Sequence, residues 1–408
     1  MTRSLKFAYL LIVFSLPAAS GLAQTQTDEP ETRAAMLQRQ REEKQRTVEP
    51  YRRNGLERAM DLAENKILPL MQRDGVYAAA GSLTTGSAFA YRGGYRDRSL
   101  VRGRGMIDAW AARSVKGYWS LEVQGAYPLV ENESLTLGGY ARRFTYPQEE
   151  YFGMGPDSDR ANQATYTLSG TYSGGQLGWK ATRRLTIGAG LENNQPTVGH
   201  GEGWPPSVED IFENIETPGF GIPLHYVRSS ANVTYDYRQP INARKGGYYR
   251  LDLSHFDDSK DTFNGFSRLD LELRQYVSFL GERRVLVGRA KVSTTSVESA
   301  GTVPFFLLPF LGGNDTLRGF RAYRFRGPHS ILLQGEYRWE IWSAFEAALF
   351  ADAGKVAMER SDLNLKSLES DYGIGFRFNT DNGVVMRVDA AFGSKDGKHL
   401  HVVFGTLF

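Results

Sequence analysis

RLDLELR, residues 268–274, is the stretch that decides the fold class of this chain, because apolar and charged side chains alternate along it residue by residue. Successive side chains of a β-strand point to opposite faces, so a strand here has one apolar face and one charged face. The same period of two recurs through residues 75–408, for example at 232–238 and 333–341. A soluble antiparallel sheet with one wet face has this pattern, and so does a barrel that crosses a membrane.

Three features favour the membrane over the soluble sheet. The alternating segments are about ten residues long, which suits tilted membrane-crossing strands. Aromatic residues recur near segment ends, as at Trp179 and Trp339, and the chain closes on an alternating segment, 400–408, whose last residue is Phe. The mean hydropathy of −0.41 excludes a helical membrane protein but suits a barrel with a wet lumen.

The expected strands number sixteen, and an even number puts both ends of the barrel on one side of the membrane. They lie near 76–83, 87–95, 103–112, 118–129, 134–144, 165–179, 185–193, 226–238, 248–256, 266–279, 285–294, 330–341, 345–354, 372–378, 384–392 and 400–408. The long loops 147–163, 195–225 and 296–329 then all fall on the other side. The sequence therefore predicts an all-β protein, a single 16-stranded antiparallel transmembrane β-barrel, with its N- and C-termini in the periplasm.

The first residues, 1–23, have the pattern of a cleaved signal peptide. Arg3 and Lys6 supply a positive start, residues 7–16 are mostly apolar, and small residues precede a cleavage point after Ala23. The apolar run is too short to cross ~30 Å of hydrocarbon, which argues against a membrane anchor.

Residues 24–74 differ in composition from the rest and are expected to form a charged, partly helical periplasmic segment. Residues 31–47 are rich in Arg, Glu, Gln and Lys, and residues 55–71 carry apolar side chains at helical spacing. The segment is interpreted as a lead-in to the barrel at 75–408, or as a helix that plugs the lumen or docks a partner.

Composition and motifs argue against several other classes of function. The chain has no cysteine, which excludes disulfides and thiolate metal sites, and a net charge of +3 gives no reason to expect nucleic acid. No Gly-x-Ser-x-Gly elbow is present, and the paired His399 and His401 are interpreted as polar residues of the lumen or rim. The acidic run 209–213 is interpreted as a solvated turn, so no catalytic, cofactor-binding or metal-binding residue is predicted.

LGGNDTLRGF at 311–320, with YRFRG at 323–327, is the most informative motif. Strand alternation turns Glu336, Phe350 and Asp352 toward the lumen. A guanidinium can pair with two carboxylates at once, so Arg318 is expected inside the lumen between Glu336 and Asp352. The alternative is that Arg318 is a solvated loop charge.

These motifs resemble the BamA/TamA family of outer-membrane barrels, also called the bacterial surface antigen family. That family carries a hydrophobic-Arg-Gly-aromatic motif in its sixth extracellular loop, matched here by Leu317, Arg318, Gly319 and Phe320. FADAG at 350–354 matches its Phe-x-Asp-x-Gly pattern, and residues 373–377 and 387–389 resemble its last strands. The resemblance implies that the loop folds back into the barrel from between strands eleven and twelve.

Two departures from the family pattern bear on function. Residues 24–74 are too short for a set of the periplasmic POTRA modules, so the resemblance is to a barrel-only member. The expected C-terminal recognition signal comprises Phe404 and Phe408, but Thr406 stands where the family has an aromatic or apolar residue.

The resemblance implies a barrel, not an enzyme, that aids insertion or translocation of proteins, or movement of lipid, at the outer membrane. A weakly sealed seam between 76–83 and 400–408 would open sideways. Expected partners are outer-membrane lipid, client outer-membrane or secreted proteins, and the barrel assembly machinery for its own insertion. The alternatives are a passive channel constricted by the loop and a lipid-modifying enzyme; the client and the oligomeric state stay open.

Overall fold

The computed structural model describes residues 33–47, 58, 73–239, 242–260, 265–297, 301–342, 344–380 and 383–404. The expected signal peptide, almost all of the stretch 55–71 and the terminal Phe408 lie outside these residues. The described residues fall into two units, the first containing a helix and the second containing the sheet.

The helix α1 (Arg33–Thr47) falls within the stretch expected to be charged and partly helical. Its sequence is rich in Ala, Gln, Glu, Lys and Arg, all of which favour helices. None of the helices in the described part of the chain is both long enough and apolar enough to cross a membrane.

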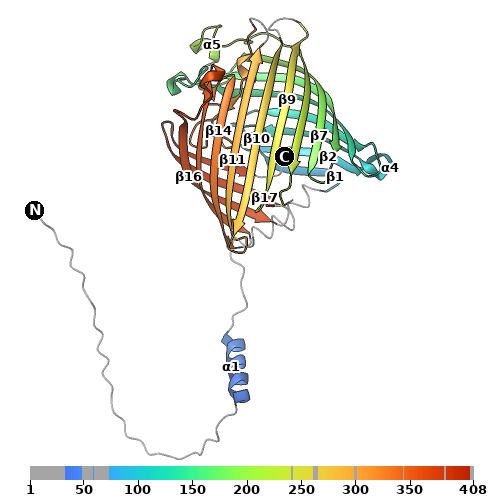
Figure 1. Ribbon diagram of the computed structural model, residues 1–408, viewed down its shortest axis with the longest axis vertical. Coiled ribbons are helices and arrows are strands. Elements are labelled where there is room, and N and C mark those ends of the chain that lie inside the picture. The colour runs from blue at the N-terminus through green and yellow to red at the C-terminus, as the bar shows by residue number, and fades with distance from the viewer. Residues whose placement is uncertain are drawn as a thin grey trace, which may run out of the picture. The chain divides into compact units, whose positions relative to one another are not determined.

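Sixteen strands form one antiparallel sheet in which each strand pairs with its neighbours along the chain (Figure 1). They are β1 (Gly75–Gly81), β2 (Ala90–Ser99), β3 (Gly105–Ser114), β4 (Trp119–Pro128), β5 (Leu135–Tyr151), β6 (Ala164–Lys180), β7 (Leu185–His200), β8 (Tyr226–Asp236), β9 (Gly246–Asp258), β10 (Phe266–Phe279), β11 (Arg284–Val297), β14 (His329–Trp342), β15 (Phe345–Ala357), β16 (Glu369–Thr380), β17 (Gly383–Ser394) and β18 (Gly397–Phe404). This confirms the predicted all-β, 16-stranded antiparallel barrel, which is nearly closed. A two-stranded ribbon, β12 (Phe310–Leu311) and β13 (Phe325–Arg326), lies in the loop between β11 and β14.

The wall is inverted relative to a soluble sheet, with apolar side chains outside and charged side chains inside. On β15, Leu349 is 52% exposed, whereas the side chains that alternate with it, Phe350 and Asp352, are 4% and 1% exposed. Burying carboxylates requires charged partners. The lumen is therefore lined by ion pairs, and the outer face is suited to hydrocarbon.

Connections alternate in length around the sheet. At one end, here called the short-turn end, β6 joins β7 through residues 181–184 and β10 joins β11 through 280–283. At the other, the long-loop end, lie residues 201–225 with the helix α5 (Val208–Ile211), which is seen among the loops at the top of Figure 1. The loop that precedes β14 lies at this end too.

Two strands continue seven residues beyond their predicted ends. β5 continues to Tyr151 and β7 to His200, so the loops expected at 147–163 and 195–225 are partly strand. The reason is packing at the long-loop end, where buried aromatic side chains of β5 and β6 surround Phe305 of the loop before β14. Such packing between distant segments favours continued pairing in polar sequence.

β2 begins three residues later than the sequence predicts, at Ala90. Ser87 instead closes a turn: its hydroxyl accepts hydrogen bonds from the backbone nitrogens of Leu83 and Thr84 at 3.0 and 3.1 Å. Ala88 follows with a φ of 60°, which a strand does not permit.

Candidate functional site

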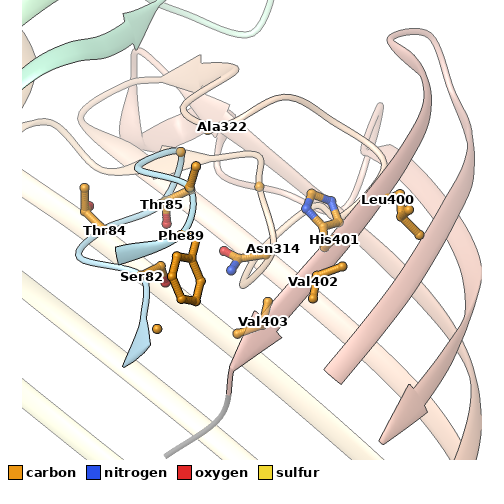
Figure 2. A pocket seen from close by; sticks show the side chains of 14 residues that line it. Ser82, Thr84, Thr85, Phe89, Asn314, Ala322, Leu400, His401, Val402 and Val403 are labelled. Carbon is orange, nitrogen blue, oxygen red and sulfur yellow. The ribbon is translucent and has the colours of Figure 1, made fainter. Parts of the chain in front are cut away.

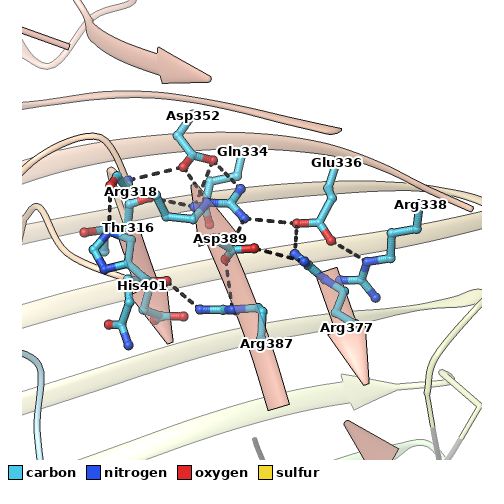
Figure 3. A network of polar contacts seen from close by, with 12 residues as sticks. Thr316, Arg318, Gln334, Glu336, Arg338, Asp352, Arg377, Arg387, Asp389 and His401 are labelled. Atoms are coloured by element: carbon cyan, nitrogen blue, oxygen red, sulfur yellow. Dashed lines mark hydrogen bonds and ion pairs between the residues drawn. The ribbon is translucent and has the colours of Figure 1, made fainter. Parts of the chain in front are cut away.

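The candidate site is built on the loop between β11 and β14, whose described residues 301–328 are called the lumenal loop here. Its Arg318 lies against the inner wall of the barrel with a side chain only 5% exposed (Figure 3). Its Nε and Nη2 donate to the two carboxylate oxygens of Asp352 at 2.7 and 2.8 Å. Its Nη1 donates to Glu336 at 3.1 Å, and its Cζ lies 3.5 Å from the ring centre of Phe350.

The strand register explains why these partners meet. On the neighbouring strands β14 and β15, Glu336 pairs with Phe350 and Gln334 pairs with Asp352, so all four side chains share the inner face. Gln334 donates from Nε2 both to Asp352 at 3.1 Å and to the carbonyl of Thr316 at 2.7 Å. The planar guanidinium of Arg318 thus binds both oxygens of Asp352, a carboxylate that Gln334 of the barrel wall already orients.

The lumenal environment keeps Arg318 charged. Burial by itself lowers the pKa of the guanidinium, but the hydrogen bonds and charge of Asp352, and then the charges of Glu336 and Asp389, raise that pKa above its usual range. Arg318 is therefore a permanent cation, and its carboxylate partners are compensated.

The ion-pair network extends beyond the residues singled out from sequence. Glu336 also accepts from Arg377 at 2.8 Å and from Arg338 at 2.5 Å. Arg377 donates to Asp389 at 2.9 Å, and Arg387 lies 3.0 Å from the other oxygen of Asp389. The resemblance places Arg377, Arg387 and Asp389 in the last strands, but local alternation carries no information on which loop these side chains face.

The remaining motif residues explain why the loop can lie so close to the wall. Leu317 and Phe320 are fully buried with the apolar cluster that includes Phe325. A Cβ on Gly319 would lie 2.4 Å from the Cβ of Asp371 on β16, so only glycine permits this approach. The sequence Leu-Arg-Gly-Phe thus supplies an apolar plug, a charged anchor and a point of close contact.

A seam interrupts the barrel between β1 and β18, the two ends of the strand order. Within the described residues no backbone hydrogen bond joins these strands. A cavity of about 480 Å³ lies at the seam, as Figure 2 shows. Its lining includes Thr85 and Phe89 from the β1–β2 connection, Asn314 from the lumenal loop, and Leu400 and Val402 from β18.

The lumenal loop holds the β18 side of this seam. His401 of β18 donates a hydrogen bond from its Nε2 to the backbone carbonyl of Arg318 at 2.7 Å. The hydroxyl of Ser394 donates to the carbonyl of Gly319. Arg324, only 1% exposed, lies 3.2 Å from Asp396 in the turn between β17 and β18.

The same loop also touches the β1 side. The hydroxyls of Tyr323 and Thr84 are 3.0 Å apart. Gly313 adopts a φ of +102°, and a Cβ there would lie 2.7 Å from the side chain of Thr85. One loop therefore bridges β18 and the β1–β2 connection, which lie on the two sides of the seam.

Comparison with known protein families identifies the barrel. Residues 101–408 match the model of the Omp85 superfamily domain. The chain belongs to the Omp85 superfamily. No curated protein matches the chain in sequence.

The fold of this Omp85 barrel also resembles solved structures. BamA from Haemophilus ducreyi lacking POTRA domains 1–3 aligns with a TM-score of 0.62 at 13% identity, over 81% of this chain and 70% of that chain. CdiB from Escherichia coli aligns with a TM-score of 0.53 at 12% identity, over 81% of this chain and 62% of that chain, so this chain spans less than two thirds of that protein. These identities support the shared fold alone.

The predicted resemblance to the BamA/TamA family is confirmed by this match. Members of the Omp85 superfamily are insertion and translocation barrels, not enzymes, and the family places this chain in the outer membrane. An insertion or translocation barrel is thus the supported function, and the passive channel is not favoured.

The structure brings together most of the site residues expected from sequence. Leu317, Arg318, Gly319, Phe320, Glu336, Phe350 and Asp352 meet in one place. The side chain of Phe404 and the whole of Phe408 lie outside the described residues. The functional roles of all these residues stay predictions. Arg324 lies in the motif at 323–327, but the sequence predicted neither its partner Asp396 nor the hydrogen bond of His401, although His399 and His401 were interpreted as polar residues of the lumen or rim.

Proposed function

We propose that this Omp85 barrel inserts or translocates client proteins by opening the seam between β1 and β18, and that the lumenal loop is the latch that holds the seam closed. The observation that carries the proposal is that one loop bonds to both sides of the seam, to β18 and to the β1–β2 connection. Other neighbouring strands are joined directly. For example, β10 and β11 pair without interruption, from Phe266 opposite Val297 to Phe279 opposite Arg284.

The latch has a fixed part and two movable ends. Arg318 fixes the loop to β14 and β15 through Glu336 and Asp352. From that point the loop reaches β18 through His401 and reaches the β1–β2 connection through Tyr323. Opening the seam requires at least one of these ends to release while the fixed part stays bound.

The strongest of the seam contacts is the buried ion pair between Arg324 and Asp396, called the clasp here. Arg324 also donates to the hydroxyl of Ser158 at 2.7 Å and to its carbonyl at 2.8 Å, and Arg160 donates to the carbonyl of Asp396 at 2.8 Å. Removing one partner of a buried ion pair costs about 3–5 kcal/mol. An ordinary hydrogen bond contributes only about 1 kcal/mol. The lumenal loop is therefore held more strongly to the β18 side of the seam, through Asp396, than to the β1 side, through Tyr323.

An open seam offers a client an unpaired strand edge. Exposed strand edges bind extended segments by adding them to the sheet, with backbone hydrogen bonds supplying affinity. On β18, Leu400 and Val402 face outward and are 69% and 52% exposed, as suits an edge that borders lipid. The clients we propose are outer-membrane or secreted proteins; movement of lipid through the same seam is the second candidate.

We also propose how the barrel is oriented in the outer membrane and how the chain is divided into segments. The short-turn end and both termini lie in the periplasm, residues 1–23 are removed, and residues 24–74 form a periplasmic segment before the barrel at 75–408. The barrel binds outer-membrane lipid, depends on the assembly machinery for its own insertion, and catalyses no reaction.

A disulfide between Gly86→Cys and Ala322→Cys tests the latch. A Cβ on Gly86 would lie 3.6 Å from that of Ala322, which suits a disulfide, and the natural chain has no cysteine to interfere. A photo-crosslinker at Leu400 should capture client from the reduced protein and lose that capture on oxidation. Gly86→Cys alone controls for strain at its φ of +84°, and a crosslinker at lipid-facing Leu349 controls for position. Equal capture in the oxidised and reduced proteins would refute the latch.

A further inference from the structure

The turn between β6 and β7 displays three cations that nothing in the described chain neutralises. Lys180 is the last residue of β6, and Arg183 and Arg184 lie in the turn that follows. All three are exposed, and within the described part of the chain their side chains form no ion pair or hydrogen bond. No Asp or Glu occurs between residues 164 and 191.

The backbone of this turn is held rigidly. The hydroxyl of Thr182 accepts hydrogen bonds from the backbone nitrogens of Arg184 and Leu185 at 3.2 and 3.0 Å. The carbonyl of Arg184 accepts from the backbone nitrogen of Asp236 on β8 at 2.8 Å. A ligand that binds these cations therefore needs to order only side chains.

An apolar surface leads directly to the cations. Trp179 faces outward and is 50% exposed, and Ile187, its partner across the β6–β7 pair, is 38% exposed. Tyr235 of β8, which pairs with Leu185, is 37% exposed on the same face. Tryptophan and tyrosine concentrate where hydrocarbon meets headgroups, so the cations beyond them lie at headgroup depth.

The basic residues of the neighbouring connection at this end, between β8 and β9, are compensated. Arg238 lies 2.8 Å from Asp236, and Lys245 pairs with Glu282. On the β5 side, the turn 129–134 carries two exposed glutamates, so the run of basic residues in the β6–β7 turn does not continue in that direction. Arg102 and Arg104 between β2 and β3, and Arg283 before β11, also form no ion pair within the described residues, but they lie on other hairpins. The β6–β7 turn is distinguished by three such cations next to the outward-facing Trp179.

We propose that Trp179, Lys180, Arg183 and Arg184 form a binding site for an anionic glycerophospholipid in the leaflet at the short-turn end. A guanidinium presents paired donors that match phosphate oxygens. Lys180 follows Trp179 at the end of β6, so its side chain starts on the opposite face of the strand and supplies a further positive charge from the rim. The indole of Trp179 lies beside the glycerol and upper acyl chain. The assignment of this leaflet to the periplasmic side rests on the orientation in the proposed function; the lipid site itself does not.

Lipid selectivity in vesicles tests the site. Full-length protein is folded in phosphatidylcholine vesicles, and its association with spin-labelled phosphatidylglycerol is compared with that of spin-labelled phosphatidylcholine. The natural protein should prefer phosphatidylglycerol, and the variant with Lys180→Gln, Arg183→Gln and Arg184→Gln should lose at least roughly fivefold of that preference, since even one cation near an anionic surface contributes about fivefold. Arg183→Glu alone should change it in the same direction.

The matched control is Arg360→Gln with Lys366→Gln, two exposed cations at the long-loop end, which should leave the preference unchanged. An unchanged preference in the triple variant, or an equal loss in the control, would overturn the site.

Labelling in cells tests the orientation separately. Arg183→Cys should react with a membrane-impermeant maleimide only after the outer membrane is permeabilised, whereas Ser361→Cys at the long-loop end should react in intact cells. Labelling of Arg183→Cys in intact cells would overturn the orientation and the leaflet while leaving the vesicle result to decide the lipid site.

Discussion

The anchor of the lumenal loop and the seam that it spans are held by different kinds of contact. At the anchor, Arg318 is enclosed by Asp352 and Glu336 on two paired strands. At the seam, β1 and β18 share no backbone hydrogen bond within the described residues and are joined through side chains of the loop. The difference indicates a fixed support beside a part that can separate.

Breaking the anchor should have the largest effect. Arg318→Ala leaves buried carboxylates without their cation, and we expect about 3–5 kcal/mol of destabilisation. The loop should become protease-sensitive near residues 321–326 while the heat-modifiable mobility of the folded barrel persists. Arg318→Lys should rescue only partly, because an ammonium does not reproduce the planar fork.

A double-mutant cycle isolates the ion pair at the anchor. Arg318→Ala combined with Asp352→Asn should show a coupling energy of about 0.5–3 kcal/mol in chemical unfolding. Additive effects would mean that the two side chains do not interact in the folded protein.

Breaking the clasp should loosen the seam but spare the anchor. Arg324→Gln leaves Asp396 buried without its cation, and we expect about 3 kcal/mol of destabilisation confined to the β17–β18 hairpin. Hydrogen exchange should speed up in β18 and stay slow in β14 and β15. Equal acceleration in all three strands would show that anchor and seam are one cooperative unit.

Gly319→Ala tests the contact between the anchor and the barrel wall, because the added methyl group would force the lumenal loop away from β16. The added methyl group would lie 2.4 Å from the Cβ of Asp371, so the loop or β16 must move. Overpacking of this kind costs about 1–3 kcal/mol. Thermal unfolding should detect the loss, and a matched Gly288→Ala on β11, where a Cβ meets nothing within 4 Å, should have little effect.

The smallest effect is expected at His401. His401→Phe removes one hydrogen bond to the carbonyl of Arg318, about 1 kcal/mol. Exchange at the β18 amides should rise modestly, and the protease resistance of the loop should not change. A loss as large as that of Arg318→Ala would place His401 in the anchor.

The sequence determined the anchor better than the seam for a physical reason. Alternation is a local property, so it placed Glu336 and Asp352 on an inner face before any tertiary contact was known. The clasp between Arg324 and Asp396 depends on the path of the lumenal loop through the lumen, which local periodicity does not encode. The continuation of β5 and β7 beyond the predicted ends has the same origin, because the packing that favours it comes from other loops.

We infer that the lumenal loop, and not strand pairing, holds β1 to β18, and the distance across the seam tests this most directly. Spin labels at Ala78→Cys and Val402→Cys would report the width of the seam, and labels at Val277→Cys and Leu286→Cys, which pair directly across β10 and β11, provide the reference. We predict that Arg324→Gln with Tyr323→Phe broadens and lengthens the distance distribution at the seam and leaves the β10–β11 pair unchanged. An unchanged seam distance in that double variant would contradict the account.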